Sequence, residues 1–146
     1  MKAKKMTIRE MIASRNRALK EETGHLAKLR RSYKRKYTGE RLQAALDGLD
    51  FYKLRCTLNR DISVVRLRIN LLKKAGKPQS RKLNSEMKIL QYKLSETIRQ
   101  ERLADCKKAV LDGRHEHMVI SFSTLGFHKV RCPYGLPISE KAPVKA

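Results

Sequence analysis

Two cysteines and three histidines in the last third of the chain are the residue types that could hold a metal ion. Three residues separate His128 from Cys132, a spacing found among zinc ligands, and His115 and His117 would lie on one side of an extended segment. Cys106 precedes them. However, no Cys-x-x-Cys pair lies upstream, and the ligands would straddle a helix end and a hairpin. The sequence therefore favours a polar linker beside a half-buried cysteine, and we assign no metal and no cofactor from it.

Catalytic motifs are missing from the sequence. It has no GxxxxGK[ST] phosphate loop, no HExxH pair and no GxSxG elbow. Asp47 and Asp50 are close together, but with a spacing of three on a helix we expect them to offset Lys53 and Arg55. The sequence predicts a protein that is not an enzyme.

A basic run, "LRRSYKRKYTG", raises a different chemistry. Residues 1–41 carry 14 Lys or Arg against four Asp or Glu, so a net charge of +10 falls in this segment out of +21 for the 146 residues. On a helix, Lys28, Arg31 and Arg35 share one edge, and like charges at this spacing destabilise a free helix. Phosphates would remove that penalty. The run therefore favours polyanion binding over a solvated helix face, which normally mixes both signs of charge.

The expected phosphate contacts extend beyond this run to three predicted helices. An α-helix enters the major groove of DNA more readily than the deep, narrow groove of A-form RNA, which favours DNA over RNA. We expect Tyr33 and Tyr37, four residues apart, to pack in the core rather than to contact nucleotides. The candidate nucleic-acid-binding residues are Arg15, Arg17, Lys28, Arg30, Arg31, Lys34, Arg35, Lys36, Arg66, Arg68, Arg81 and Lys82.

Composition limits the remaining possibilities for the core, the cellular compartment and membrane insertion. The chain has 40% hydrophobic residues, no Trp and eight Phe or Tyr, which predicts a thin aliphatic core between helices. Three cysteines without paired spacing suggest a reducing compartment, cytoplasmic, nucleoid or nuclear. The sequence shows no apolar run long enough for a membrane span, and its basic start has no signal-peptide core.

Hydrophobic periodicity predicts three long helices, at about 7–37, 40–75 and 80–112. The sequence from Thr7 to Glu10 has the form of a capping box, Gly24 is expected inside the first helix, and Gly39 is a candidate stop. Gly76 is expected to end the second helix, and Ser80 to cap the third. The second helix has a nearly heptad apolar stripe that comprises Phe51, Leu54, Leu58, Ile62, Val65, Ile69 and Leu72.

The predicted fold is mainly α. Residues 1–112 form a basic helical domain, in which the second and third helices make a long antiparallel, coiled-coil-like hairpin and the first either completes a three-helix arrangement or projects as an arm. Alternation of apolar residues after Gly113 predicts a small β-hairpin within 113–135, and 136–146 is expected to be a flexible tail.

Together these features predict a non-enzymatic nucleic-acid-binding protein, DNA-binding more than RNA-binding, with a regulatory (transcriptional) or architectural role. Two alternatives stay open. The chain could be an RNA-binding structural component of a ribonucleoprotein particle, or the heptad stripe could make it a coiled-coil interaction module for an acidic protein. A homodimer or a helical protein partner is possible, and a homodimer of hairpins is compatible with the nucleic-acid-binding hypothesis as well as with the interaction module.

Overall fold

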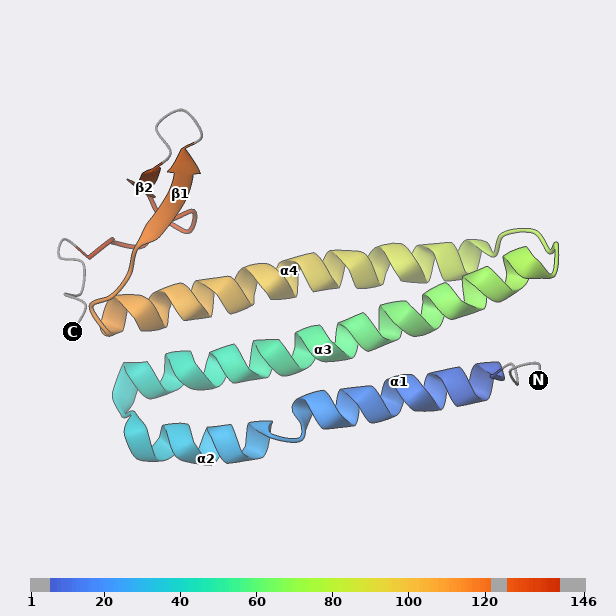
Figure 1. Cartoon of the computed structure of the whole chain (residues 1–146), viewed down its shortest axis with the longest axis horizontal. Helices are drawn as coiled ribbons and strands as arrows, with labels where there is room; N and C mark the ends of the chain where they lie inside the picture. Colours follow the sequence, from blue (N-terminus) through green and yellow to red (C-terminus); the bar gives the residue numbers. More distant parts are fainter. Residues whose placement is uncertain (1–5, 122–125, 140–146) are drawn as a thin grey trace.

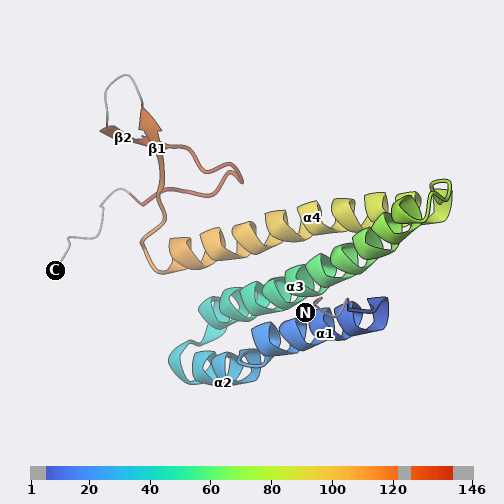
Figure 2. The same ribbon diagram turned by 45° about the vertical axis from the view of Figure 1, so that its right-hand side comes forward.

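A computed structural model of the chain describes residues 6–121 and 126–139, which form four helices and two short strands. The helices are α1 (Ile8–Thr23), α2 (Leu26–Lys36), α3 (Gly39–Lys74) and α4 (Arg81–Leu111). Helix α3 lies in the middle, with α4 along one side and α1 and α2 end to end along the other (Figures 1 and 2). The mainly helical fold is confirmed, and the first segment joins the bundle instead of projecting as an arm.

Helices α3 and α4 form the predicted antiparallel hairpin. Their bounds differ by only about one residue from those predicted, because the sequence signals at both sides of the turn are strong. Gly76 has φ +66°, and the Lys77 N–H donates to the Leu72 carbonyl at 3.0 Å, which closes α3 in a Schellman motif. The Ser80 hydroxyl then accepts the Leu83 N–H at 3.2 Å and caps α4.

The prediction of a single helix over 7–37 is wrong. The Thr7 hydroxyl caps α1 by accepting the Glu10 N–H at 3.2 Å, as expected. However, α1 ends at Thr23, and α2 begins only at Leu26, after Gly24 and His25. Glycine is a poor helix former, so this is where a long helix breaks most cheaply to follow its neighbour. Gly39, with φ +60°, opens α3 after Thr38 instead of following the last turn of α2 directly.

The core is thin, as the composition predicts. It is made by the seam between α3 and α4, where Leu58, Ile62 and Val65 are buried on α3 and Thr97 and Ala104 are buried on α4. The middle of the predicted heptad stripe is therefore covered within the chain itself. Leu54 is the exposed member of the stripe, at 46% of its surface.

Two strands follow α4. Strand β1 (His117–Ser121) pairs antiparallel with β2 (Gly126–Val130), with His117 opposite Val130 and Ser121 opposite Gly126. Residues 122–125, where the turn is predicted, lie outside the described residues, so the complete hairpin stays a prediction. The strands stand at the end of the bundle where α4 finishes (Figure 1).

The segment after β2 is held against the start of the strand region. Ser139 exchanges hydrogen bonds with the backbone of His115: its N–H donates to the His115 carbonyl at 2.8 Å, and its hydroxyl accepts the His115 N–H at 3.1 Å. Up to Ser139 the predicted flexible tail is therefore in contact with the fold, while 140–146 lie outside the described residues. Within residues 6–121 and 126–139, no helix has the length and apolar character needed to cross a bilayer.

Candidate functional site

Helix α2 divides its side chains between the bundle and the surface. Leu29 and Tyr33 face α3 and α4 and line a partly open cavity, while most of the cations lie at a separate hollow on the surface of the helix. Four of these cations, Lys28, Arg31, Arg35 and Lys36, surround one surface hollow of about 340 Å³ together with Ser32. We call these four residues the α2 basic face.

The α2 basic face has no intramolecular counter-charge in the described structure. Five arginines of the described residues form ion pairs with carboxylates: Arg30 with Asp50, Arg41 with Asp112, Arg55 with Glu101, Arg60 with Asp61 and Arg99 with Glu96. None of these pairs includes a member of the face. Within the described residues no carboxylate therefore forms an ion pair with the face.

Arg30 is the exception among the candidates on α2. Its guanidinium donates to the Asp50 carboxylate on α3, so it points toward the protein and not into the hollow. The expectation that Asp47 and Asp50 offset Lys53 and Arg55 is wrong, because Asp50 pairs with Arg30 and the Asp47 carboxylate accepts a hydrogen bond from Gln43 at 2.8 Å. Arg55 pairs across the helix seam instead.

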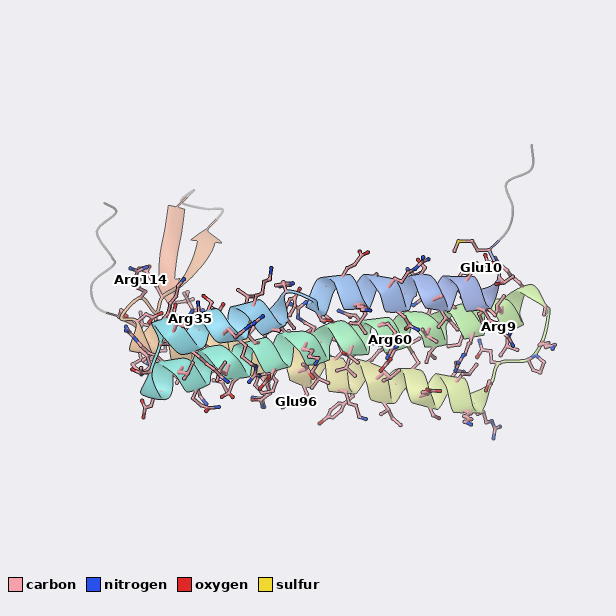
Figure 3. All side chains as sticks on the ribbon, turned by 90° about the horizontal axis from the view of Figure 1, so that it is seen from below. Arg9, Glu10, Arg35, Arg60, Glu96 and Arg114 are labelled. Carbon is pink, nitrogen blue, oxygen red and sulfur yellow. The ribbon has the colours of Figure 1, made fainter. Side chains whose placement is uncertain are left out.

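The twelve candidate residues do not form one surface. Arg15 and Arg17 lie on α1, whereas Arg66, Arg68, Arg81 and Lys82 lie around the far end of the α3–α4 hairpin. About 20 residues of α3 separate that end from the part that contacts α2, which corresponds to roughly 30 Å along the helix. In Figure 3, Arg35 lies toward the end that carries the strands, and Arg9 lies toward the other. Lys34 belongs to α2 but does not line the hollow.

The tyrosines of the basic run contact protein groups. Their rings meet edge to face with centroids 5.7 Å apart, and the Lys108 ammonium of α4 lies 5.4 Å from the Tyr33 centroid and 4.9 Å from that of Tyr37. This arrangement favours the packing role over nucleotide contact, since a cation already lies against both rings.

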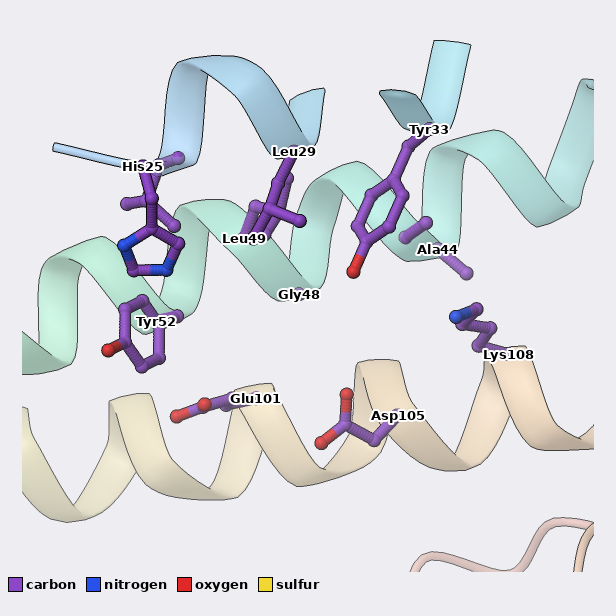
Figure 4. A pocket seen from close by; sticks show the side chains of 12 residues that line it. His25, Leu29, Tyr33, Ala44, Gly48, Leu49, Tyr52, Glu101, Asp105 and Lys108 are labelled. Carbon is purple, nitrogen blue, oxygen red and sulfur yellow. The ribbon is translucent and has the colours of Figure 1, made fainter. Parts of the chain in front are cut away.

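A cavity of about 280 Å³ lies where α2, α3 and α4 meet (Figure 4). Its polar side chains include His25, Tyr52, Glu101 and Asp105. The Glu101 carboxylate accepts two hydrogen bonds from the Arg55 guanidinium, at 2.6 and 3.1 Å, so it forms a structural ion pair between α3 and α4. Burial, followed by the nearby Glu101 charge, raises the pKa of Asp105. Among the described side chains of this cavity, no hydrogen bond joins a nucleophile to a base.

The second candidate site comprises cysteines and histidines near the C-terminal end of α4. For these residues the sequence favours a polar linker over a metal site. Cys106 on α4, His115 in the following loop, His117 at the start of β1 and Cys132 after β2 bring their ligand atoms within 4.8 Å of one another. We call these four residues the Cys-His cluster. The sequence suggests that a helix end and a strand pair would keep these ligands apart, but the chain turns back after α4 and brings the His117 Nε2 to 3.5 Å from the Cys106 Sγ (Figure 1). The side chain of His128 lies outside the described side chains.

Local sequence explains how the loop reaches Cys132. In the segment "CPYGL", Gly135 has φ +74° and its N–H donates to the Cys132 carbonyl at 3.1 Å, which makes a tight turn. Burial acts to raise the pKa of the Cys132 thiol, but backbone N–H groups of Tyr134 and Leu136 outweigh it, so this pKa lies below its usual range. Burial, then the neighbouring Cys132, raises the pKa of Cys106 to about 11. The turn explains how the chain bends at Cys132, whereas only the fold brings this cysteine to the other three residues.

Comparisons with protein-family models, with curated proteins and with solved structures gave no match to this chain.

Proposed function

We propose that the chain is a non-enzymatic nucleic-acid-binding protein that contacts phosphates through the α2 basic face, with duplex DNA as its first target. One observation supports this most strongly: Lys28, Arg31, Arg35 and Lys36 converge on a single surface hollow and form no ion pair within the described residues. Four uncompensated cations repel one another, and a phosphodiester backbone would neutralise them.

The overall charge points the same way. A formal charge of +21 exceeds what solubility needs, and it opposes compaction of a slender fold with a thin core. A densely anionic partner would offset this repulsion. Contacts of this kind give affinity without sequence information, so the proposal predicts binding that depends strongly on salt and weakly on sequence.

The alternative of a coiled-coil interaction module has less support. It rests on the heptad stripe of α3, but Leu58, Ile62 and Val65 in that stripe are buried within the chain. An RNA-binding structural role uses the same cations as DNA binding, and is therefore an outcome of the experiment below.

The test measures binding of the full chain to duplex DNA, to the matching single strand and to an RNA hairpin, each over a series of salt concentrations. The test variant replaces Lys28, Arg31 and Arg35 with Gln. Its matched control replaces Lys88, Lys93 and Arg102, three cations of α4, with Gln. Both variants lose the same net charge, and Arg30 is left intact because its loss would break the pair with Asp50.

We expect duplex affinity to fall steeply with salt in the wild-type protein and the α2 variant to reduce that slope by about 2.7, at about 0.9 for each phosphate that is no longer neutralised. The control variant should keep most of the slope. Affinity that is indifferent to salt would contradict the proposal, as would equal reductions of the slope in the two variants. Stronger binding to the RNA hairpin than to the duplex would move the target from DNA to RNA.

A further inference from the structure

The Cys-His cluster has the size of a metal coordination shell. The Nε2 atoms of His115 and His117 are 3.0 Å apart, and the Cys106 Sγ is 3.5 Å from the His117 Nε2. Tetrahedral zinc, with bonds of about 2.0–2.3 Å, places its ligand atoms roughly 3.3–3.8 Å from one another. Three of the donors therefore already lie near this spacing, and all four ligand atoms, Cys132 Sγ included, lie within 4.8 Å of one another.

His115 is oriented as metal-bound histidines are. Its side chain is buried, with 2% of the residue surface exposed, and its Nδ1 lies 2.5 Å from the Pro137 carbonyl. Because a carbonyl only accepts, Nδ1 carries the proton and the Nε2 lone pair points into the cluster. A backbone carbonyl on the second ring nitrogen is the usual way in which proteins fix the tautomer of a histidine ligand.

The place of the Cys-His cluster in the fold suits a metal ion that would hold the strand region to α4. The two strands pair with each other and project to one side of the bundle near the C-terminal end of α4 instead of lying along a helix (Figure 1), and an isolated pair of short strands is marginally stable in water. The four cluster residues come from α4, the following loop, the start of β1 and the segment after β2. An ion held by all four would tie these segments together at one point.

We propose that Cys106, His115, His117 and Cys132 bind one zinc ion, which fastens the β1–β2 segment to the C-terminal end of α4. Two thiolates and two imidazoles suit zinc, and four protein ligands leave no open position, so the site is structural and not catalytic. Binding would displace the thiol protons and leave both sulfurs as thiolates. This site is independent of the α2 basic face.

The first test is the metal content of the full chain, purified under reducing conditions from zinc-supplemented medium. We expect one zinc per chain, and after exchange with cobalt we expect the visible bands of tetrahedral cobalt with thiolate charge transfer. The variants Cys106→Ser and Cys132→Ser should lower zinc affinity at least about 10-fold in competition with a chelator, the lower end of the loss seen when even outer-shell partners are removed. The control, Cys56→Ser, alters a buried cysteine of α3 outside the cluster and should retain zinc.

A second measurement uses only the wild-type chain, in case the serine variants do not fold. Removing zinc with a chelator should raise hydrogen exchange at residues 114–121 and 126–139, and leave the middle of α3 protected. Re-addition of zinc should reverse the change. The proposal is overturned by a reduced wild-type protein that binds no stoichiometric zinc, by a Cys106–Cys132 disulfide in its place, by equal zinc loss in Cys56→Ser, or by exchange that zinc removal does not alter.

Discussion

The Arg30 guanidinium on α2 donates to the Asp50 carboxylate on α3, although its sequence neighbour Arg31 faces the hollow of the α2 basic face. Two adjacent arginines of one basic run thus have different surroundings. We predict that Arg31→Gln lowers the salt slope of duplex binding by about 0.9, because one phosphate is no longer neutralised. Arg30→Gln should leave the slope nearly unchanged. Fluorescence anisotropy over a salt series measures both.

The two variants remove the same charge from the same helix, so each is the control for the other. Arg30→Gln also tests the pair itself: because both side chains are largely exposed, the free energy of unfolding should fall by no more than about 1 kcal/mol. Equal reductions of the salt slope in both variants would show that net charge, and not the hollow, determines binding.

A partly buried ion pair joins Arg55 on α3 to Glu101 on α4. The contact is bidentate, at 2.6 and 3.1 Å, and the Glu101 side chain is only 17% exposed. Glu101→Gln removes the charge and one acceptor while it keeps the volume. We predict a fall in the free energy of unfolding of about 1–2 kcal/mol, between the values for exposed and buried pairs.

Urea denaturation of the full chain measures this change. The control is Glu96→Gln, which removes a carboxylate from an exposed pair with Arg99 within α4 and should be less harmful than Glu101→Gln. If Glu96→Gln destabilised the protein as much as Glu101→Gln, the cross-helix geometry would have no special value.

Asp105 gives a prediction about pH. Burial and then the Glu101 charge raise its pKa in the folded protein. The folded state therefore binds this proton more tightly than the unfolded chain, so the favourable contribution of Asp105 is complete below the ordinary Asp pKa of about 3.9 and is lost as the pH rises through the folded-state pKa. We predict that Asp105→Asn is more stable than the wild type at neutral pH and that the difference shrinks in acid.

Urea midpoints at neutral and acidic pH test this sign. Asp47→Asn is the matched control, because it removes one carboxylate from α3 and leaves an amide oxygen to accept the Gln43 hydrogen bond. A neutral-pH midpoint for Asp105→Asn that lies below that of the wild type would contradict the assignment.

The helical hairpin was predictable because its signals are local. Gly76 and Ser80 define the turn, and the periodic apolar residues from Leu58 to Val65 define the seam. The division of the first helix was not predictable in this way. Gly24 costs only about 1 kcal/mol inside a helix, so its effect depends on the packing of α1 and α2 against α3, which is a tertiary property.

The two candidate sites also differ in how far local sequence predicts them. Helical spacing predicts that Lys28, Arg31 and Arg35 share one edge, and the structure adds Lys36, so that four of the twelve predicted cations form the α2 basic face. The Cys-His cluster does not follow from local spacing, because Cys106 and Cys132 are separated by a loop and two strands, and only the fold shows that they meet. Side-chain partners were also hidden: the pairing of Arg30 with Asp50 depends on how α2 lies along α3.

The Lys108 ammonium lies over the rings of Tyr33 and Tyr37. A substitution of Tyr37 therefore tests whether this ring packs in the bundle or stacks on a base. Tyr37→Leu removes a cation–π contact and an edge-to-face aromatic pair, so we predict a decrease of about 1 kcal/mol in the free energy of unfolding. Affinity for single-stranded DNA should change less than about twofold, whereas removal of an aromatic ring that stacks on a base would cost roughly 1–3 kcal/mol, or about 5-fold and more. Tyr37→Phe, which keeps the ring, is the control and should be close to wild type in both measurements. Weakened single-strand binding by Tyr37→Leu with unchanged stability would assign the ring to the nucleic acid instead of to the bundle.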